Sequence, residues 1–155
     1  MSQPIRPSTV LPAIRTPFNV TTDDGQSLSG EVAAPIDGRR SPALLTLHPN
    51  PTGGGMMDSH IYKKAANRLP AMAGITIVRF NTRGTTSEAG TSTGTYENGD
   101  SEKFDVEAMI NYCCDQLIPM ATPHTVAWRD GEEDLRRHWH NICWSKRHHR
   151  RPKNF

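Results

Sequence analysis

Histidines and a cysteine gather close to the C-terminus at a spacing that raises the question of metal binding. The pattern is His-x-His-x-x-Cys followed by a His-His pair, formed by His138, His140, Cys143, His148 and His149. Imidazole and thiolate groups bind zinc and copper. Structural zinc sites use cysteine pairs, however, and Cys143 has no second cysteine at the required spacing. We therefore predict no metal site and no cofactor, and interpret these residues as chance enrichment in a basic tail.

The same tail combines positive charge with aromatic rings. From Arg136 onward there are seven Lys or Arg and no Asp or Glu, interleaved with Trp139, Trp144 and Phe155. Lysine and arginine follow phosphates, and aromatic rings stack on bases. A non-catalytic interaction or nucleic-acid-binding protein that uses this tail is therefore the alternative function. Because the pattern is generic, we interpret residues 129–155 as a disordered, solvated tail and expect no nucleic-acid partner.

The remainder of the chain has the periodicity of regular strands. Residues 14–20 and 27–34 are rich in strand formers and flank a turn that ends with Asp24-Gly25, which predicts an antiparallel hairpin. Residues 43–47 and 75–80 are short apolar runs, typical of strands buried on both faces. A helix between these two runs implies a parallel pair with a right-handed crossover.

Two helices are predicted from caps and apolar stripes. The first begins at Asp58 or Ser59 and is bounded by Pro70 and Gly74. Its stripe is Ile61, Ala65, Ala66 and Leu69. The second begins at Asp100 or Ser101, and its stripe is Val106, Met109, Ile110, Cys113 and Leu117. Residues 124–128 are the candidate for a third parallel strand. The fold class is thus α/β, with a flexible N-terminus over residues 1–11 and one domain over residues 12–128.

Two segments resemble motifs of the α/β-hydrolase family. The segment from His48 to Gly55, His-Pro-Asn-Pro-Thr-Gly-Gly-Gly, is similar to the loop after the third strand in a subgroup with a His-Pro-x-Pro…Gly-Gly motif. Phe80-Asn81-Thr82-Arg83-Gly84 resembles the Phe-Asn-x-Arg-Gly turn after that subgroup's fourth strand. The resemblance covers residues 12–118 or so. It implies a partial α/β-hydrolase-like sheet and, for the parent family, hydrolysis of an ester or other acyl bond in a small molecule by a serine nucleophile.

The resemblance also suggests roles for residues in the two segments. Acyl transfer needs backbone N–H groups aimed at the developing oxyanion. Proline has no N–H, so by position Asn50 is the candidate donor, with Gly53 and Gly54 allowing a close approach of the backbone. His48 comes too early in the chain to be the family's catalytic base. Arg83 is interpreted as a loop anchor that bonds carbonyls, or alternatively as a functional cation. Asn81 and Gly84 complete the turn.

The family's nucleophile lies in Gly-x-Ser-x-Gly on a sharp turn between a strand and a helix. One match exists, from Gly90 to Gly94, and its serine is Ser92. It lies in a Gly/Thr/Ser/Glu-rich segment that we expect to be a flexible polar loop, with no apolar strand leading into it. We therefore interpret Ser92 as a decoy and name no catalytic residue. Whether the chain is an enzyme is left open.

After residue 117 the periodicity and the family motifs are lost together. A reading-frame change or a truncation produces such a loss, so we expect a catalytically incomplete chain. A sheet without its further strands keeps an open apolar edge, which predicts oligomerisation or aggregation. The N-terminus lacks the apolar stretch of a signal peptide, no apolar run is long enough to span a membrane, and three cysteines suggest no disulfide framework. These features predict a cytoplasmic protein with no membrane partner.

Overall fold

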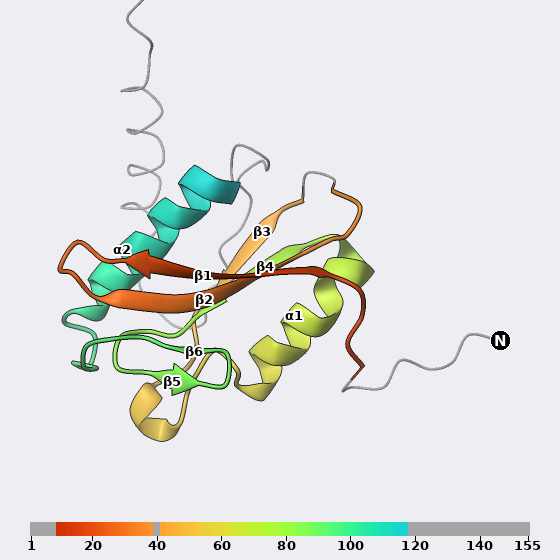
Figure 1. Cartoon of the computed structure of the whole chain (residues 1–155). Coiled ribbons are helices and arrows are strands. Elements are labelled where there is room, and N and C mark those ends of the chain that lie inside the picture. The colour runs from red at the N-terminus through yellow and green to blue at the C-terminus, as the bar shows by residue number, and fades with distance from the viewer. Residues whose placement is uncertain (1–8, 39–40, 118–155) are drawn as a thin grey trace, which may run out of the picture.

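A computed structural model describes residues 9–38 and 41–117 of the chain. Its centre is a four-stranded sheet with the order β1-β2-β4-β3 (Figure 1). The strands are β1 (Ile14–Thr21), β2 (Ser27–Ala34), β3 (Ala43–Thr46) and β4 (Thr76–Phe80). β1 and β2 are antiparallel, β2 and β4 are antiparallel, and β3 and β4 are parallel. The predicted fold class, a leading hairpin followed by strand-helix-strand-helix, is therefore confirmed.

The first hairpin is closed by the turn that the sequence indicates. Gly25 has a φ of +86°, which a residue with a side chain rarely adopts. The Thr22 N–H donates to the carbonyl oxygen of Gln26 at 2.8 Å, and the Thr22 hydroxyl bonds the Asp24 carboxylate at 2.5 Å. On the sheet, the ring of Phe18 lies so close to Gly30 that an added Cβ would meet it at 2.3 Å. Glycine at position 30 thus lets the aromatic ring cross its neighbouring strand.

Helix α1 (His60–Ala73) covers one face of the sheet (Figure 1). Ser59 is its N-cap, and it ends at Gly74, which has a φ of +64°. Two details of the sequence prediction are wrong. Pro70 lies inside the helix instead of bounding it, and Ile61 is 69% exposed instead of belonging to the buried stripe. The buried contact to the sheet is made by Ala66, with Leu69 beside it.

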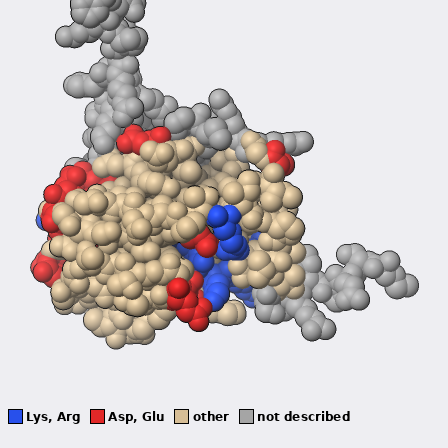
Figure 2. All heavy atoms as spheres, viewed as in Figure 1, with Lys and Arg blue, Asp and Glu red and all other residues tan. Residues whose placement is uncertain are grey.

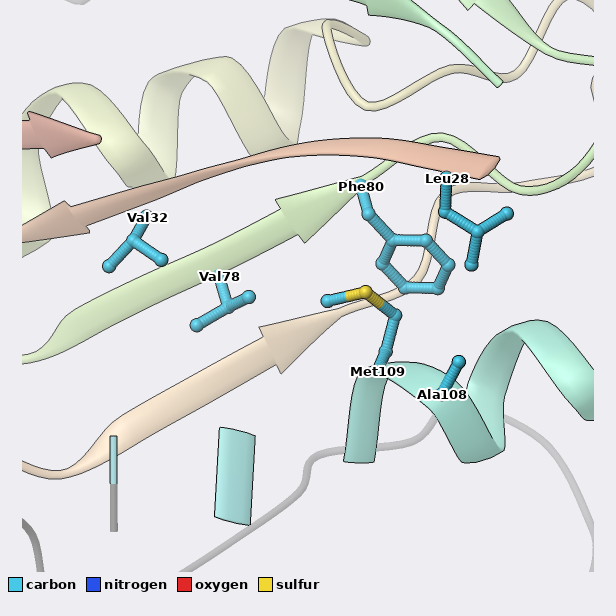
Figure 3. Close-up of a cluster of buried hydrophobic side chains, with 6 residues drawn as sticks. All are labelled: Leu28, Val32, Val78, Phe80, Ala108 and Met109. Atoms are coloured by element: carbon cyan, nitrogen blue, oxygen red, sulfur yellow. The ribbon is translucent and has the colours of Figure 1, made fainter. Parts of the chain in front are cut away.

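Helix α2 (Glu102–Tyr112) covers the opposite face and continues as the short π-helix η2 (Cys113–Leu117). Met109 and Ala108 pack against the sheet residues Leu28, Val32, Val78 and Phe80 (Figure 3). The Tyr112 ring stacks on Phe18 of β1 with the ring centroids 4.3 Å apart. The two helices on opposite faces give the three layers expected for this fold class.

Strand β3 differs from its prediction in burial. We expected both 43–47 and 75–80 to be buried on both faces, but only β4 is buried along its whole length, whereas every residue of β3 is half-buried. The reason is position: β4 lies between β2 and β3, and in the described residues β3 pairs only with β4.

The glycine- and serine-rich segment after β4 is ordered, contrary to the expectation of a flexible loop. It forms a small hairpin of β5 (Thr86–Ser87) and β6 (Gly90–Thr91). Of the predicted N-terminal segment, the structure describes residues 9–11, where the Leu11 N–H donates to the carbonyl oxygen of Asn67 at 2.8 Å. Residues 1–8, the third-strand candidate at 124–128 and the basic tail lie outside the described residues. In the described part, none of the helices has both the length and the apolar character needed to cross a membrane.

Candidate functional site

The two motif-bearing segments meet at one end of the sheet. The loop of residues 48–55, which we call the β3 loop, follows β3 and contains the short 3-10 helix η1 (Pro51–Gly53). The turn of residues 81–85, the β4 turn, follows the parallel strand β4. Ligands of α/β folds bind outside the carboxyl ends of parallel strands. The contact between the two segments is a hydrogen bond from the Thr82 N–H to His48 Nε2 at 3.0 Å.

The bonds of His48 define its protonation state. The backbone N–H of Thr82 can only donate, so Nε2 accepts and carries no proton. The carbonyl oxygen of Pro49, 2.7 Å from Nδ1, can only accept, so Nδ1 carries the proton. Burial lowers the pKa of His48 below its usual 6.5, although the bond to Pro49 acts in the opposite direction. His48 is therefore a neutral, buried imidazole that ties the β3 loop to the β4 turn.

A hydroxyl also faces this imidazole. Thr82 Oγ1 lies 3.2 Å from His48 Nε2 and 3.3 Å from Thr85 Oγ1. A hydroxyl beside an oriented imidazole is the arrangement of an activated nucleophile. In this case Nε2 already accepts a hydrogen bond from the Thr82 N–H, and both Thr82 and His48 are buried. The pair is accordingly a structural contact, which the sequence analysis did not identify.

Asn50 organises the β3 loop around itself. Its carbonyl oxygen accepts the N–H groups of Gly53 and Gly55, both at 3.1 Å. Its side-chain oxygen accepts the N–H and the hydroxyl of Thr52 at 2.8 and 2.7 Å. Further along, every N–H from Gly54 to Met57 is also bonded. Among the described residues, by contrast, nothing accepts a hydrogen bond from the Asn50 N–H, and Asn50 is exposed.

Three consecutive glycines shape this loop in different ways. Gly53 and Gly54 were predicted to allow a close approach, but a Cβ added at either position would meet open space. Gly54 has a φ of +82°, a conformation that favours glycine. The close approach of the backbone occurs at Gly55, where a Cβ would lie 1.9 Å from the carbonyl oxygen of Pro49. Gly55 was not singled out from the sequence, because a run of glycines does not reveal which member faces another segment.

Asn81 is fully buried and joins three parts of the chain. Its side-chain oxygen accepts the Met57 N–H at 2.9 Å, and its amide group donates to Ser87 Oγ and to the carbonyl oxygen of Gly90 at 3.0 and 2.9 Å. The side chain thus holds the end of the β3–α1 connection against the β5–β6 hairpin. The sequence predicted only a local role for this side chain in the turn, but its hydrogen bonds join segments on both sides of the turn.

Arg83 is a buried ion-pair centre. Its guanidinium makes four hydrogen bonds, two to Asp105 of α2 and two to Asp24 of the β1–β2 turn, at 2.7 to 3.2 Å. Its own N–H also donates to Asp105 at 2.8 Å. The hydrogen bond from Arg83 is the main cause that lowers the pKa of Asp24. Arg83 therefore anchors the turn to carboxylates, where carbonyls had been expected. The next residue, Gly84, has a φ of +68°.

Ser92 is buried and both functions of its hydroxyl are used. Oγ donates to the carbonyl oxygen of Asn81 at 2.7 Å and accepts the Ser29 N–H at 2.9 Å. The neighbouring Gly90 has no room for a Cβ, which would lie 1.9 Å from Ser29 Oγ. The segment thus packs directly on β2 and on the end of β4.

Carboxylates were the main residues that the sequence analysis missed. Asp105 lies four residues before Met109, so it falls on the buried stripe of its helix, and a charge in that position signals a buried partner. On the other side of the sheet, buried Arg79 bonds Asp58 and Glu31 at 2.7 and 3.0 Å. Figure 2 shows Lys and Arg gathered in one area of the viewed face with acidic atoms beside them, so the basic charge there is locally balanced.

The tail residues for which metal and nucleic-acid binding were considered, and not predicted, lie outside the described residues. Across residues 9–38 and 41–117, no group of three or more His, Cys, Asp or Glu is placed to hold a metal ion.

Comparison with protein families gives one match in a limited region. The model of the Rv1322 family protein matches residues 107–145, which include part of α2 and part of the basic tail. This is less than half of the chain. No curated protein matches.

Comparison with solved structures gives a consistent group. XC6422 from Xanthomonas campestris, an α/β serine hydrolase without a lid, is 29% identical with a TM-score of 0.57, over 75% of this chain and 51% of its own. An α/β serine hydrolase homologue from Coxiella burnetii is 27% identical with a TM-score of 0.52, over 66% and 47%. The Pyrococcus furiosus esterase Pf2001 is 19% identical with a TM-score of 0.54, over 70% and 40%.

The chain spans about half the length of these structures. The likeness to Pf2001 concerns the fold alone, whereas the two serine hydrolases also share more than a quarter of the aligned sequence. The chain has an α/β-hydrolase-like fold, and its structural neighbours support a relationship to the hydrolase family.

Proposed function

We propose that this chain is a relative of the α/β serine hydrolases that retains the oxyanion-binding loop but is catalytically incomplete. The parent activity is hydrolysis of an ester or other acyl bond in a small molecule by a serine nucleophile. The observation that carries the proposal is the N–H of Asn50, which has no acceptor among the described residues, whereas every N–H from Thr52 to Gly55 in the same loop is bonded. A preorganised donor of this kind stabilises the oxyanion of acyl transfer.

The incompleteness is supported by the surroundings of Ser92. A nucleophilic serine must be exposed to substrate and must have a base within reach of its hydroxyl. Ser92 Oγ is buried, and it donates to a backbone carbonyl, which cannot take its proton. His48, the one buried histidine among the described residues, has its acceptor nitrogen bonded to Thr82.

A fluorophosphonate probe tests this part of the proposal, because an activated serine displaces fluoride and becomes covalently labelled. We expect no labelling of the native full-length chain under conditions in which an active serine hydrolase is labelled. Labelling that mass spectrometry places on Ser92, and that Ser92→Ala abolishes, would overturn the proposal. Labelling on another serine would show a nucleophile elsewhere in the chain and overturn it as well.

The proposal includes truncation or a frameshift as the origin of the incomplete chain. The joint loss of periodicity and motifs after residue 117 supports it. The match to the Rv1322 family protein over residues 107–145 argues against a truncation or frameshift, because the match extends into the tail. Sequencing the DNA through and beyond codons 118–155 in all three frames decides. An alternative frame with an apolar strand, a Gly-x-Ser-x-Gly turn and a helix supports truncation or a frameshift; three frames without them refute it.

The exposed position of β3 supports self-association as a further part of the proposal. In the described residues β3 is an edge strand with half-buried leucines at positions 44 and 45. Such an edge pairs readily with another strand. Light scattering should show oligomers or aggregates, and a monomer with a sharp, reversible thermal transition would contradict this expectation.

A further inference from the structure

His48 joins two segments through two bonds of opposite direction. Nδ1–H donates to the Pro49 carbonyl oxygen within the β3 loop, and Nε2 accepts the Thr82 N–H from the β4 turn. Only the neutral ring with its proton on Nδ1 can make both bonds. A second proton on Nε2 would place two donors opposite each other at 3.0 Å, so the bond to Thr82 would be lost.

The Pro49 carbonyl transmits any movement of the ring to the β3 loop. This oxygen accepts the imidazole proton and also lies against Gly55, where even a Cβ has no space. The loop cannot shift at one point without shifting at the other, since the Asn50 carbonyl between them accepts the N–H groups of Gly53 and Gly55. The position of the Asn50 N–H therefore depends on the ring.

Among the described residues, the pKa of His48 is set by its burial and by these bonds, and the nearby charged groups are paired with other partners or belong to other elements. The β3 loop contains no charged residue. The β4 turn carries Arg83, which is paired with Asp24 and Asp105. Packed against β3 is η2, whose titratable residues are Cys113, Cys114 and Asp115. Within the described residues, no carboxylate is bonded to His48 that would stabilise a second proton on its ring.

We propose that His48 is a positioning residue that acts as an acid-sensitive latch, holding the β3 loop on the β4 turn while neutral and releasing the Thr82 N–H when protonated. The latch itself stands on the two bonds. Its consequence, loss of the oxyanion donor in acid, rests on the function proposed for Asn50.

The direction of the pH dependence follows from the fold. Burial holds the pKa of His48 in the folded chain below the unfolded value of 6.5, so the unfolded chain takes up the proton first. The contribution of His48 to stability is complete above pH 6.5. It decreases as the pH falls from 6.5 to the pKa of the folded chain and then stays constant.

Hydrogen–deuterium exchange of the full-length chain tests the latch, read at the Thr82 amide after correction for intrinsic rates. We expect protection to fall about tenfold between roughly pH 7.5 and a pH below the pKa of His48 in the folded chain, because one hydrogen bond is lost. In His48→Gln the amide oxygen can accept the Thr82 N–H but does not titrate, so protection should be the same at both pH values. His60→Gln, at an exposed position, should behave like the unchanged chain.

Equal pH dependence in the unchanged chain and in His48→Gln would overturn the latch. So would a Thr82 amide that is unprotected near neutral pH. His48→Phe, which removes both bonds, should lack protection at either pH; if it does not fold, the comparison with His48→Gln still decides. This result is independent of the fluorophosphonate experiment, so the latch and the proposed function can fail separately.

Discussion

Arg15 Nη2 donates a hydrogen bond to the carbonyl oxygen of Ala66 at 3.1 Å. This is the carbonyl that the N–H of residue 70 would engage in a regular helix, and residue 70 is a proline. A side chain from β1 thus supplies the donor that the helix lacks. The same guanidinium bonds Asn67 Oδ1 at 2.7 Å and Glu31 at 2.8 Å. The helix continues through Pro70 because a strand 51 residues away in sequence completes it.

Replacing Arg15 with methionine should destabilise the chain by about 1–2 kcal/mol, because a buried carbonyl loses its donor. The cost should be about 1 kcal/mol smaller in a Pro70→Ala background, where the alanine N–H takes over the bond. Urea denaturation of the four proteins of this double-mutant cycle measures the difference. An Arg15→Met cost that is unchanged by Pro70→Ala would show that the carbonyl is irrelevant.

Gly55→Ala should cost about 2–3 kcal/mol or prevent folding, since the new Cβ would collide with the backbone oxygen of Pro49. Gly53→Ala is the matched control: it lies in the same loop, its Cβ would meet open space, and its effect should stay within about 0.5 kcal/mol. The comparison is made by urea denaturation. Equal effects at the two positions would contradict the close approach at Gly55.

Arg83→Met should destabilise the chain by about 3–5 kcal/mol, because it leaves the fully buried Asp105 carboxylate without its cation. Adding Asp105→Leu should restore part of this loss, since the unpaired charge is then removed. Lys63→Met, which breaks the exposed pair with Glu88, should change stability by no more than about 0.5 kcal/mol. A double variant less stable than Arg83→Met would argue against the unpaired charge as the cause.

Ser92→Ala should cost about 1–3 kcal/mol, because the buried Ser29 N–H loses its acceptor and the Asn81 carbonyl loses its donor. Thr91→Ala, at an exposed neighbouring position, should stay within about 0.5 kcal/mol. Thermal or urea unfolding followed by circular dichroism provides the measurement. A Ser92→Ala chain as stable as the unchanged one would show that the two hydrogen bonds do not contribute to stability.

Local pattern in the sequence was sufficient for the elements whose determinants are adjacent in the chain. The Asp24-Gly25 turn specifies the first hairpin, and the spacing of Met109 and Ile110 specifies the buried face of α2. The motif residues Asn50 and His48 also lie at the end of the strand predicted for them. These features depend on backbone preference and periodicity, which a single sequence displays.

What the sequence did not reveal depends on partners that are far away in the chain. Ser92 is buried where its hydroxyl accepts the Ser29 N–H. Helix α1 continues through Pro70 where Arg15 bonds the carbonyl oxygen of Ala66. Strand β3 is half-buried because it lies at the edge of the sheet among the described residues. The role of His48 likewise depends on Thr82, 34 residues later. None of these partners has a spacing that identifies it in advance.

The placement of β2 has a consequence for the order in which the chain is synthesised. Its hairpin partner β1 precedes it directly, but Gly30 of β2 also pairs with Phe80, and the core over it is closed by Met109. During translation the first hairpin therefore emerges with Leu28 and Val32 uncovered. These side chains stay exposed until Met109 of α2 has been synthesised, 75 residues after the hairpin ends at Ala34. Exposed apolar strands of nascent chains attract chaperones and other nascent chains. The need for assistance on the ribosome is thus concentrated in the stretch of synthesis between the hairpin and α2.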